Sequence, residues 1–458
     1  MKNLFTFIQR LLLYLTLGIS ILFVDSCKTN DTLTPEPVLV NHSADVPIRW
    51  AKMSLKIAEK TPGNSPTYAS RGFGFLGLTM YETVVNGYPD YKSMVGQLTD
   101  LSSLPKPVTG QTYNWVLSLN AGQAFMLKNI YEQTSDKNKT SIDSLEALVV
   151  SEISKTETKD VVDKSVAYGQ EVAKAIFEYS KTDGGYQGYK VNFPTDYQLI
   201  ISSGSWTPPA FSQSPSKLPL HPYWGQHRTF LEANNTLQVP KMLDYSTQKT
   251  SAYYLQFLEV YNKSQMLTDA EMAIAVWWSD DPSQTFTPPG HSYSLANIAV
   301  KTANANLIQA ARTFAGVGMS IADAFVICWK CKYHYMVERP SSFIRKNIAP
   351  SWLQFWPEPP FPAFYSGHAV QGAATATVLT SIYGDNFKFT DNSHEGRQDD
   401  VISGIPYKNR NFNSFNDAAA ESANSRFLGG IHTKYDNEIG LTEGKKIGAN
   451  VNNLLWKK

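Results

Sequence analysis

Three short motifs in the last third of the chain carry the side chains that an oxyanion site needs. They are Lys332-x6-Arg339-Pro340, Ser366-Gly367-His368 and Ser425-Arg426-x5-His432-x3-Asp436. Cations balance the charge of a tetrahedral or trigonal-bipyramidal oxyanion, while a hydroxyl and a backbone N–H donate to its oxygens. One imidazole can bond the central atom and a second can move protons. The three motifs together therefore predict a pocket for a phosphate-like anion.

The residues around the first two motifs predict the elements that position them. Residues 317–338 have the pattern of a helix, which would place Lys332 and Arg339 two turns apart on one face. Residues 366–383 follow a proline-rich stretch and predict a helix whose first N–H groups point at the anion.

The third motif is predicted to join two helices. Ser414 is the expected N-cap of a helix over 415–428, and Gly429-Gly430 ends that helix. His432 then opens a last helix, where Asp436 lies one turn later and can orient the imidazole ring. Each motif alone is as well explained by a solvated helix face, a helix cap or a surface pair. Their occurrence together and in this order favours a site.

These motifs resemble the signature of the type 2 phosphatidic acid phosphatase/vanadium haloperoxidase superfamily. Longer stretches are similar to its vanadium-dependent haloperoxidase branch, especially to bacterial members. Those stretches are 328–333, 359–364, 425–432 and, near the start of the chain, 70–82. The resemblance extends from about residue 45 to the end of the chain. It implies an all-α fold of two helical bundles, with the active site within the C-terminal bundle.

The resemblance also implies a role for each residue of the motifs. His432 would bond vanadium, or attack phosphorus in a phosphatase, and Asp436 would orient it. His368 would be the acid–base group. The groups that would hold the equatorial oxygens of vanadate are Lys332, Arg339, Arg426, Ser366 and the N–H of Gly367. Tyr365 departs from the family pattern, which usually has proline there, and its hydroxyl could enter the pocket.

Two aromatic residues are candidates for a halide pocket. Trp329 lies one helical turn before Lys332, and Phe361 lies seven residues before His368. An apolar wall beside the oxyanion would suit a large, weakly hydrated halide, so iodide or bromide is favoured. The alternative is that both rings belong to the core.

The residues and the resemblance leave three functions open. The leading prediction is a vanadium-dependent haloperoxidase with vanadate as cofactor, hydrogen peroxide and halide as substrates, and a small organic acceptor. The second is an extracytoplasmic acid phosphatase that uses His432 as nucleophile on a phosphate ester and needs no cofactor. The third is a non-catalytic surface lipoprotein.

Residues 1–27 are predicted to be a lipoprotein signal peptide. Lys2 and Arg10 precede an apolar run from Leu11 to Phe23. The pair Ser26-Cys27 that follows resembles a bacterial lipobox. Cleavage would leave a lipidated Cys27 and a tether over residues 28–42. The alternative is a plain secretory signal. The protein is thus expected outside the cytoplasm, in the periplasm or at the cell surface, with the lipid anchor as its only membrane contact.

The rest of the chain is predicted to form two bundles, over 43–245 and 246–458, with an irregular region over 183–245. The helices are expected near 45–60, 67–86, 110–134, 139–155, 159–181, 247–262, 268–279, 291–313, 317–338, 366–383, 415–428 and 434–454. Residues 189–193 are a short strand candidate. The net charge is +1 and no basic tract stands out, so nucleic acid is not an expected partner.

Two further features concern single residues. Cys328 and Cys331 lie within a predicted helix and are expected to be reduced, buried thiols rather than a disulfide or half a zinc site. His291 follows a turn-rich stretch, 277–290, that could line a pocket. The other histidines outside the motifs show no ligand spacing and are expected to be structural or surface residues.

Overall fold

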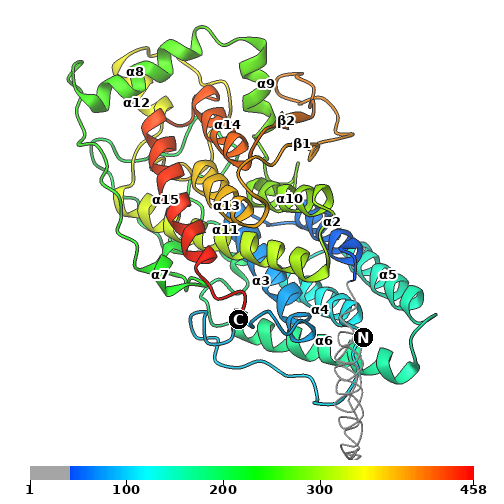
Figure 1. Ribbon diagram of the computed structural model, residues 1–458. Helices are drawn as coiled ribbons and strands as arrows, with labels where there is room; N and C mark the ends of the chain where they lie inside the picture. Colours follow the sequence, from blue (N-terminus) through cyan, green and yellow to red (C-terminus); the bar gives the residue numbers. More distant parts are fainter. Residues whose placement is uncertain (1–41) are drawn as a thin grey trace, which may run out of the picture. The chain divides into compact units, whose positions relative to one another are not determined.

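One long helix, α11 (Leu307–Tyr335), lies at the centre of the fold, as Figure 1 shows. The computed structural model describes residues 42–458. Around α11 pack α3 (Pro66–Glu82), α10 (Thr287–Thr302), α13 (Gly367–Tyr383) and α15 (Lys434–Asn452). The predicted all-α class is confirmed.

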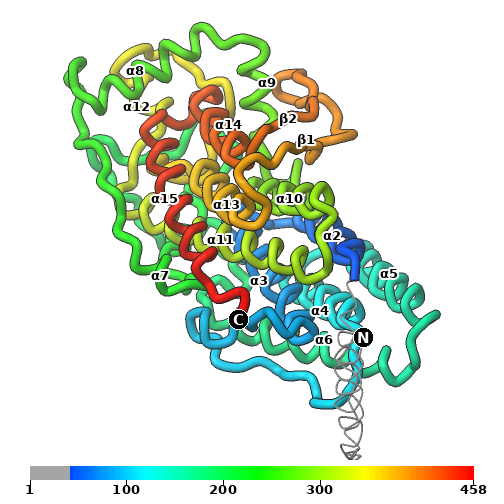
Figure 2. The backbone as a smooth tube through the Cα atoms, in the orientation of Figure 1, coloured from blue at the N-terminus to red at the C-terminus, as the bar shows by residue number. Residues whose placement is uncertain are grey.

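The remaining elements surround this centre. They are α2 (Asp45–Lys60), α4 (Trp115–Ile130), α5 (Asp136–Ile153), α6 (Lys159–Ser180), α7 (Glu232–Asn235), α8 (Ala252–Ser264), α9 (Asp269–Trp277), α12 (Pro340–Asn347), α14 (Phe415–Leu428), the 3-10 turns η1 (Val85–Gly87), η2 (Gly188–Val191) and η3 (Trp224–Gln226), and the strands β1 (Phe389–Asp391) and β2 (Arg410–Phe412). The helices α2 to α6 pack on one another, and the tube in Figure 2 shows them together in blue to green.

The helix that carries Lys332 differs from its prediction at both ends. It begins at Leu307 rather than at 317, because Gly316 and Gly318 do not interrupt it. A Cβ on Gly318 would lie 2.4 Å from the Phe73 carbonyl oxygen, so glycine lets α3 and α11 approach closely. The helix ends at Tyr335, where Met336 takes a left-handed conformation with φ of 52°. Lys332 and Arg339 therefore do not share a helix face, and that prediction was wrong.

Arg339 instead stands at the N-cap of α12, a short helix that sequence reasoning missed. Pro340 occupies the first position of α12, where its missing N–H is not needed. The strand predicted over 189–193 is also wrong, since residues 188–191 form the turn η2. Within residues 42–458, the strands β1 and β2 pair antiparallel, with Phe389 opposite Phe412.

Helix α15 packs against α13 through a row of glycines spaced four residues apart. A Cβ would lie 2.9 Å from the Ser366 carbonyl oxygen at Gly440, and 2.2 Å from the Val370 carbonyl oxygen at Gly444. No side chain fits between the two backbones at these points. The row fixes the distance between the helices that carry the second and third motifs.

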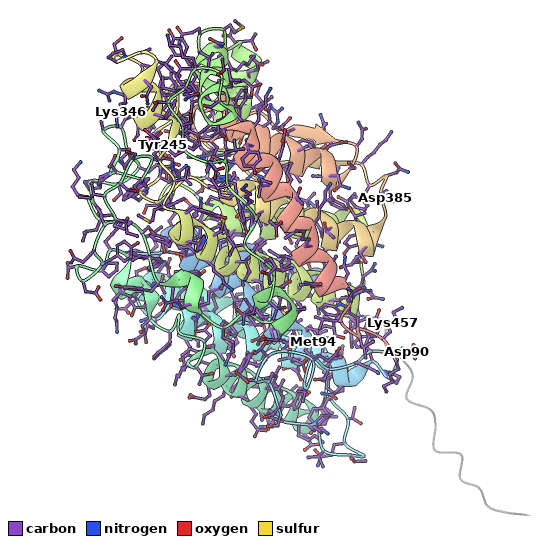
Figure 3. All side chains as sticks on the ribbon, turned by 90° about the vertical axis from the view of Figure 1, so that its left-hand side faces the viewer. Asp90, Met94, Tyr245, Lys346, Asp385 and Lys457 are labelled. Carbon is purple, nitrogen blue, oxygen red and sulfur yellow. The ribbon has the colours of Figure 1, made fainter. Side chains whose placement is uncertain are left out.

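The C-terminal segment returns to the loop that follows α3. The backbone N–H of Lys92 donates to the carbonyl of Trp456 at 3.0 Å, and Tyr91 pairs with Lys457. Figure 3 shows Asp90 and Lys457 close together, and the N–H of Lys458 donates to the Asp90 carbonyl at 3.0 Å. The last helix is thereby tied to the first half of the chain.

Within the described residues, α11 alone is long and apolar enough to span a membrane by composition. Its most apolar stretch is 94% buried by surrounding helices. That degree of burial is the pattern of a core helix.

Candidate active site

The N-terminus of α13 presents the second motif. Ser366 is the N-cap, and its hydroxyl accepts a hydrogen bond from the N–H of Ala369 at 3.4 Å. A Cβ built on Gly367 would meet no atom within 4 Å, so the space beside this residue's Cα is open. The Nε2 atom of His368 is buried and finds no hydrogen-bond partner among the described residues. Burial and the nearby Arg426 lower the pKa of His368 well below its usual range.

The third motif holds His432 in a defined tautomer. Its Nδ1 lies 2.9 Å from Oδ2 of Asp436, which sits in the first turn of α15 and completes a capping box with Thr433. Burial and three cations, Arg339, Lys332 and Arg426, lower the pKa of His432 well below its usual range. The neutral ring therefore donates from Nδ1 and carries a lone pair on Nε2.

Lys332 reaches the same place from α11. Its ammonium donates to the carbonyl oxygens of Pro362, Ala363 and Tyr365 at 2.9, 2.7 and 2.7 Å. The side chain is fully buried, and burial lowers the pKa of Lys332 to about 8.

The two arginines are equally buried. Arg339 donates from Nη1 to the Ile431 carbonyl at 2.9 Å and to Nε2 of His432 at 3.0 Å. Arg426 donates from Nη1 to the Trp278 carbonyl at 3.1 Å, and its Nε has no partner within residues 42–458. In that range, neither arginine nor Lys332 forms a direct ion pair with a carboxylate. Three buried cations thus converge on a neutral histidine.

A cavity of about 430 Å³ opens onto this group. Gly367, His368, Arg426 and His432 line it, whereas Lys332, Arg339 and Ser366 lie behind its surface. Further lining residues come from 63–66, 192–193, 211–214, 279–284, 357 and 359–361. The turn-rich stretch after α9 therefore does line a pocket, although His291 itself lies behind it.

The two predicted halide-pocket rings also line the cavity. The rings of Trp329 and Phe361 pack against each other with centroids 4.8 Å apart. The Lys332 Nζ lies 5.2 Å from the Phe361 centroid, and the Arg339 guanidinium carbon lies 5.1 Å from it. An apolar face thus adjoins the cations, although both rings are also part of the core packing.

Tyr365 points away from the cavity. Its ring is fully buried and is not among the lining residues. Burial, with Cys328, Cys331 and Glu443 nearby, raises the pKa of the Tyr365 hydroxyl well above its usual range. Both cysteines are free and buried, as expected.

Sequence reasoning missed two carboxyl groups beside the arginines. Glu358 is fully buried and accepts from the hydroxyl and N–H of Ser341, and burial raises its pKa to about 7. Asp281 lines the cavity, and burial raises its pKa to about 7 against the opposing charge of Arg426. Glu358 stands among prolines and so has no periodic signal. The run Trp277-Trp278-Ser279-Asp280-Asp281 was the one available hint of the second group.

The fold and the site together define a helical protein with a buried oxyanion site. We call this site the oxyanion cradle, and it consists of Lys332, Arg339, Ser366, Gly367, Arg426 and His432. The family model described as the VCPO second helical-bundle domain matches residues 312–457. The vanadium chloroperoxidase of Curvularia inaequalis is 23% identical over 397 residues, which cover 73% of this chain and 65% of that protein. This chain thus spans slightly less than two thirds of that relative.

Similar solved structures are also vanadium-dependent haloperoxidases. A bacterial vanadium-dependent iodoperoxidase is 30% identical, with a TM-score of 0.77 over 91% of this chain and 97% of the other. A bacterial vanadium-dependent chloroperoxidase in its holo form is 17% identical, with a TM-score of 0.66 over 87% and 93%. The chain belongs to the vanadium haloperoxidase family.

Proposed function

We propose that this protein is a vanadium-dependent haloperoxidase that uses hydrogen peroxide to oxidise halide. The observation that carries the proposal is the convergence of three buried cations, none paired directly with a described carboxylate, on the neutral ring of His432. Desolvated cations require an anion nearby. Family membership supports vanadate as that anion.

The residues present fit vanadate. Arg426 Nε and His368 Nε2 are buried donors or acceptors that have no partner in the described part of the chain, and both residues line the cavity. Gly367 lines the cavity, and a Cβ built on it would meet no atom within 4 Å. Lys332, Arg339, Arg426, Ser366 and Gly367 would hold the anion's oxygens, and Nε2 of His432 would bond the metal. Vanadate, when bound, supplies Lewis-acid activation of hydrogen peroxide.

The protein's own groups then have separate tasks. Asp436 accepts from Nδ1 of His432 and keeps the lone pair on Nε2. His368 is neutral and lines the cavity, so it can take a proton from an incoming peroxide and return it later. Trp329 and Phe361 exclude water from one side and lower the local dielectric.

A phosphatase reaction is the second candidate, because the same geometry favours it. The Nε2 lone pair of His432 could attack a phosphate ester held by the same cations. No cofactor would then be needed.

One assay separates these functions. The purified protein, with and without orthovanadate, is tested for peroxide-dependent iodide oxidation and for hydrolysis of a phosphate ester. We expect halide oxidation only after vanadate loading, and none in His432→Ala. The control His334→Ala changes an exposed histidine on α11 and should keep full activity. Vanadate-independent ester hydrolysis without halide oxidation would establish the phosphatase. Neither activity, with the protein folded, would favour a non-catalytic lipoprotein.

Vanadate binding tests the cradle directly. A charge-assisted hydrogen bond contributes about 1.5–3 kcal/mol, so Arg426→Ala should weaken vanadate binding roughly tenfold to a hundredfold. The fold should persist, because removing one cation relieves repulsion in the ligand-free protein. Calorimetry measures the affinity and a thermal melt checks the fold. If Arg426→Ala bound vanadate as tightly as the wild type does, Arg426 would not be one of the residues that hold the anion.

We further propose that the preferred halide is iodide or bromide. The apolar face of Trp329 and Phe361 supports this, as does the likeness to an iodoperoxidase. Phe361→His would place a titratable ring beside the cations, and the halide ranking and pH optimum should both change. If Phe361→His and Trp329→Ala both leave the ranking as it was, the rings are core residues only.

A further inference from the structure

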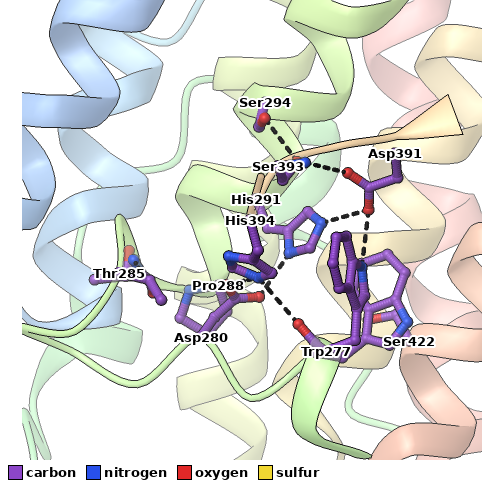
Figure 4. A network of polar contacts seen from close by, with 12 residues as sticks. Trp277, Asp280, Thr285, Pro288, His291, Ser294, Asp391, Ser393, His394 and Ser422 are labelled. Atoms are coloured by element: carbon purple, nitrogen blue, oxygen red, sulfur yellow. Dashed lines mark hydrogen bonds and ion pairs between the residues drawn. The ribbon is translucent and has the colours of Figure 1, made fainter. Parts of the chain in front are cut away.

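A second cluster of buried polar side chains, drawn in Figure 4, adjoins the cavity, because one of its members, Asp280, also lines the cavity. The ring of His291 lies between two carboxylates, with Nδ1 2.7 Å from Oδ2 of Asp280 and Nε2 2.8 Å from Oδ2 of Asp391. His394 completes the group, with Nε2 3.2 Å from Oδ1 of Asp280. All four side chains are at most 4% exposed. The cluster shares no residue with the oxyanion cradle and carries the opposite charge.

The charge of this cluster favours a divalent cation. Asp280 and Asp391 bring two negative charges into the interior, where uncompensated charge is costly. One proton shared with His291 leaves a net negative charge. One divalent ion balances both carboxylates with both imidazoles neutral, which is the protonation state in which histidine binds metals.

The geometry also fits a metal ion. One ligand atom each from Asp280, His291 and His394 lies within 4.8 Å of the others. Zinc–nitrogen and zinc–oxygen bonds of about 2.0–2.2 Å would set such atoms about 3–3.5 Å apart, so the three side chains would draw together around a bound ion. Asp391 contacts the far nitrogen of His291, which is the position of the carboxylate that orients a metal-bound histidine. The Trp277 carbonyl oxygen, 3.0 Å from Nε2 of His394, offers a further oxygen ligand.

The buried Oδ1 of Asp280 and the strained backbone around it also indicate a bound ligand. In the described part of the chain, Oδ1 of Asp280 has no well-aligned hydrogen bond, although it is buried. The backbone that presents it is strained, since Asp280, Ser283 and Thr287 have φ values of 49°, 68° and 71°. Non-glycine residues rarely adopt this conformation, and it clusters at binding sites. The ring of His394 is fixed by stacking on Phe286, with centroids 5.6 Å apart.

We propose that Asp280, His291 and His394 bind a divalent transition-metal ion, with Asp391 orienting His291. Two imidazoles and a carboxylate suit Zn²⁺ and other borderline ions better than Ca²⁺ or Mg²⁺. The ion would fasten the loop after α9 to α10 and to the β1–β2 connection. That loop carries the Trp278 carbonyl, which accepts from Arg426, so the metal would hold one wall of the oxyanion site in place.

Metal content tests this directly. The full chain, purified with a histidine-free tag, is dialysed against metal-free buffer, incubated with Zn²⁺, desalted and measured by mass spectrometry of the elements. We expect one bound zinc per chain, with or without vanadate. Asp280→Asn and His394→Ala should lose it. Asp391→Asn should retain one zinc but bind it about tenfold to a hundredfold more weakly in a chelator competition.

His334→Ala is the matched control, because it removes an exposed histidine and should leave the zinc content unchanged. The proposal is overturned if the folded wild-type protein retains no stoichiometric Zn²⁺, Fe²⁺, Mn²⁺ or Co²⁺. The cluster would then be a protonated His291 held by two carboxylates. It is equally overturned if His394→Ala binds zinc as wild type does. Neither outcome tests the proposed halide oxidation, which is measured in a separate activity assay.

Discussion

At the scale of single residues, the cradle is held ready by backbone carbonyls. Lys332 and Arg339 donate to the carbonyls of residues 361–365 and 431, and Arg426 donates to that of residue 278. Carbonyl dipoles orient a cation without neutralising its charge. The cations are therefore preorganised and still require an anion.

The lowered pKa of Lys332 gives vanadate binding a dependence on pH. Burial brings this pKa to about 8. Below that pH the ammonium is already charged when the anion arrives. Above it, binding must be accompanied by uptake of one proton, so affinity should fall by up to about tenfold per pH unit, or about 1.4 kcal/mol.

Calorimetry in buffers of different ionisation enthalpy measures that proton uptake. Vanadate also changes its own protonation, so Lys332→Arg serves as the control, because its guanidinium stays charged throughout. The wild-type affinity should fall more steeply with pH than that of Lys332→Arg. Equal slopes would show that Lys332 does not titrate in this range.

At the scale of elements, the site depends on how closely α15 lies to α13. The N–H of Ser366 donates to the carbonyl of Asp436 at 3.2 Å, which links the two motifs directly. The glycine row of α15 permits this approach. The spacing between helices thus sets the spacing between His432 and the N-terminus of α13.

A methyl group in this row should disturb both stability and binding. In Gly444→Ala the Cβ would lie 2.2 Å from the Val370 carbonyl oxygen, so the helices must separate. We expect a loss of about 1–3 kcal/mol in the free energy of unfolding and weaker vanadate binding. Gly372→Ala is the matched control, since its nearest neighbour would be 3.5 Å away and alanine favours a helix by about 1 kcal/mol. Equal denaturation midpoints for the two variants would contradict this account.

The sequence predicted helices well where caps and breakers agree with periodicity. Residues 45–60 and 415–428 match α2 and α14, and Ser414 does cap α14. The prediction failed where packing overrides local preference. A gap between helices was expected at 314–316, but these residues lie within α11. The break after Tyr335 depends on a left-handed Met336 that has no sequence signal.

The candidate site was predictable for a related reason. Its charged and nucleophilic residues fall in three short motifs, so their types and order were visible. The positions of these residues in space, however, could not be predicted from the sequence. Arg339 reaches His432 from an N-cap rather than from the helix of Lys332, and Asp281 and Glu358 join through loops whose paths only tertiary structure determines.

At the scale of the whole molecule, we propose a lipoprotein exported from the cytoplasm and anchored through Cys27. Cys27 lies outside the described residues, so the proposal depends on the lipobox-like sequence. The catalytic domain would reach beyond the membrane on the tether of residues 28–42.

Processing at Cys27 can be measured in cells. The wild-type chain should partition into the membrane fraction, and intact mass should show a lipid-modified Cys27 as the first residue. Cys27→Ser should leave the protein unlipidated, either released or still carrying its signal peptide. The substitution Ser26→Ala keeps a small residue before the cysteine and should be processed normally. An unmodified N-terminus at another residue would instead indicate a plain secretory signal.

The walls of the cavity have a consequence for how this protein could diversify. Every proposed anion-holding residue lies between 332 and 436, whereas segments at 63–66, 192–193 and 211–214 also line the cavity. Exchanging those segments with a relative would alter which organic molecules fit while leaving each cradle residue in place. Part of the cavity lining is therefore encoded in stretches of the gene that are separate from those encoding the proposed anion-holding residues, and recombination can change the former without the latter.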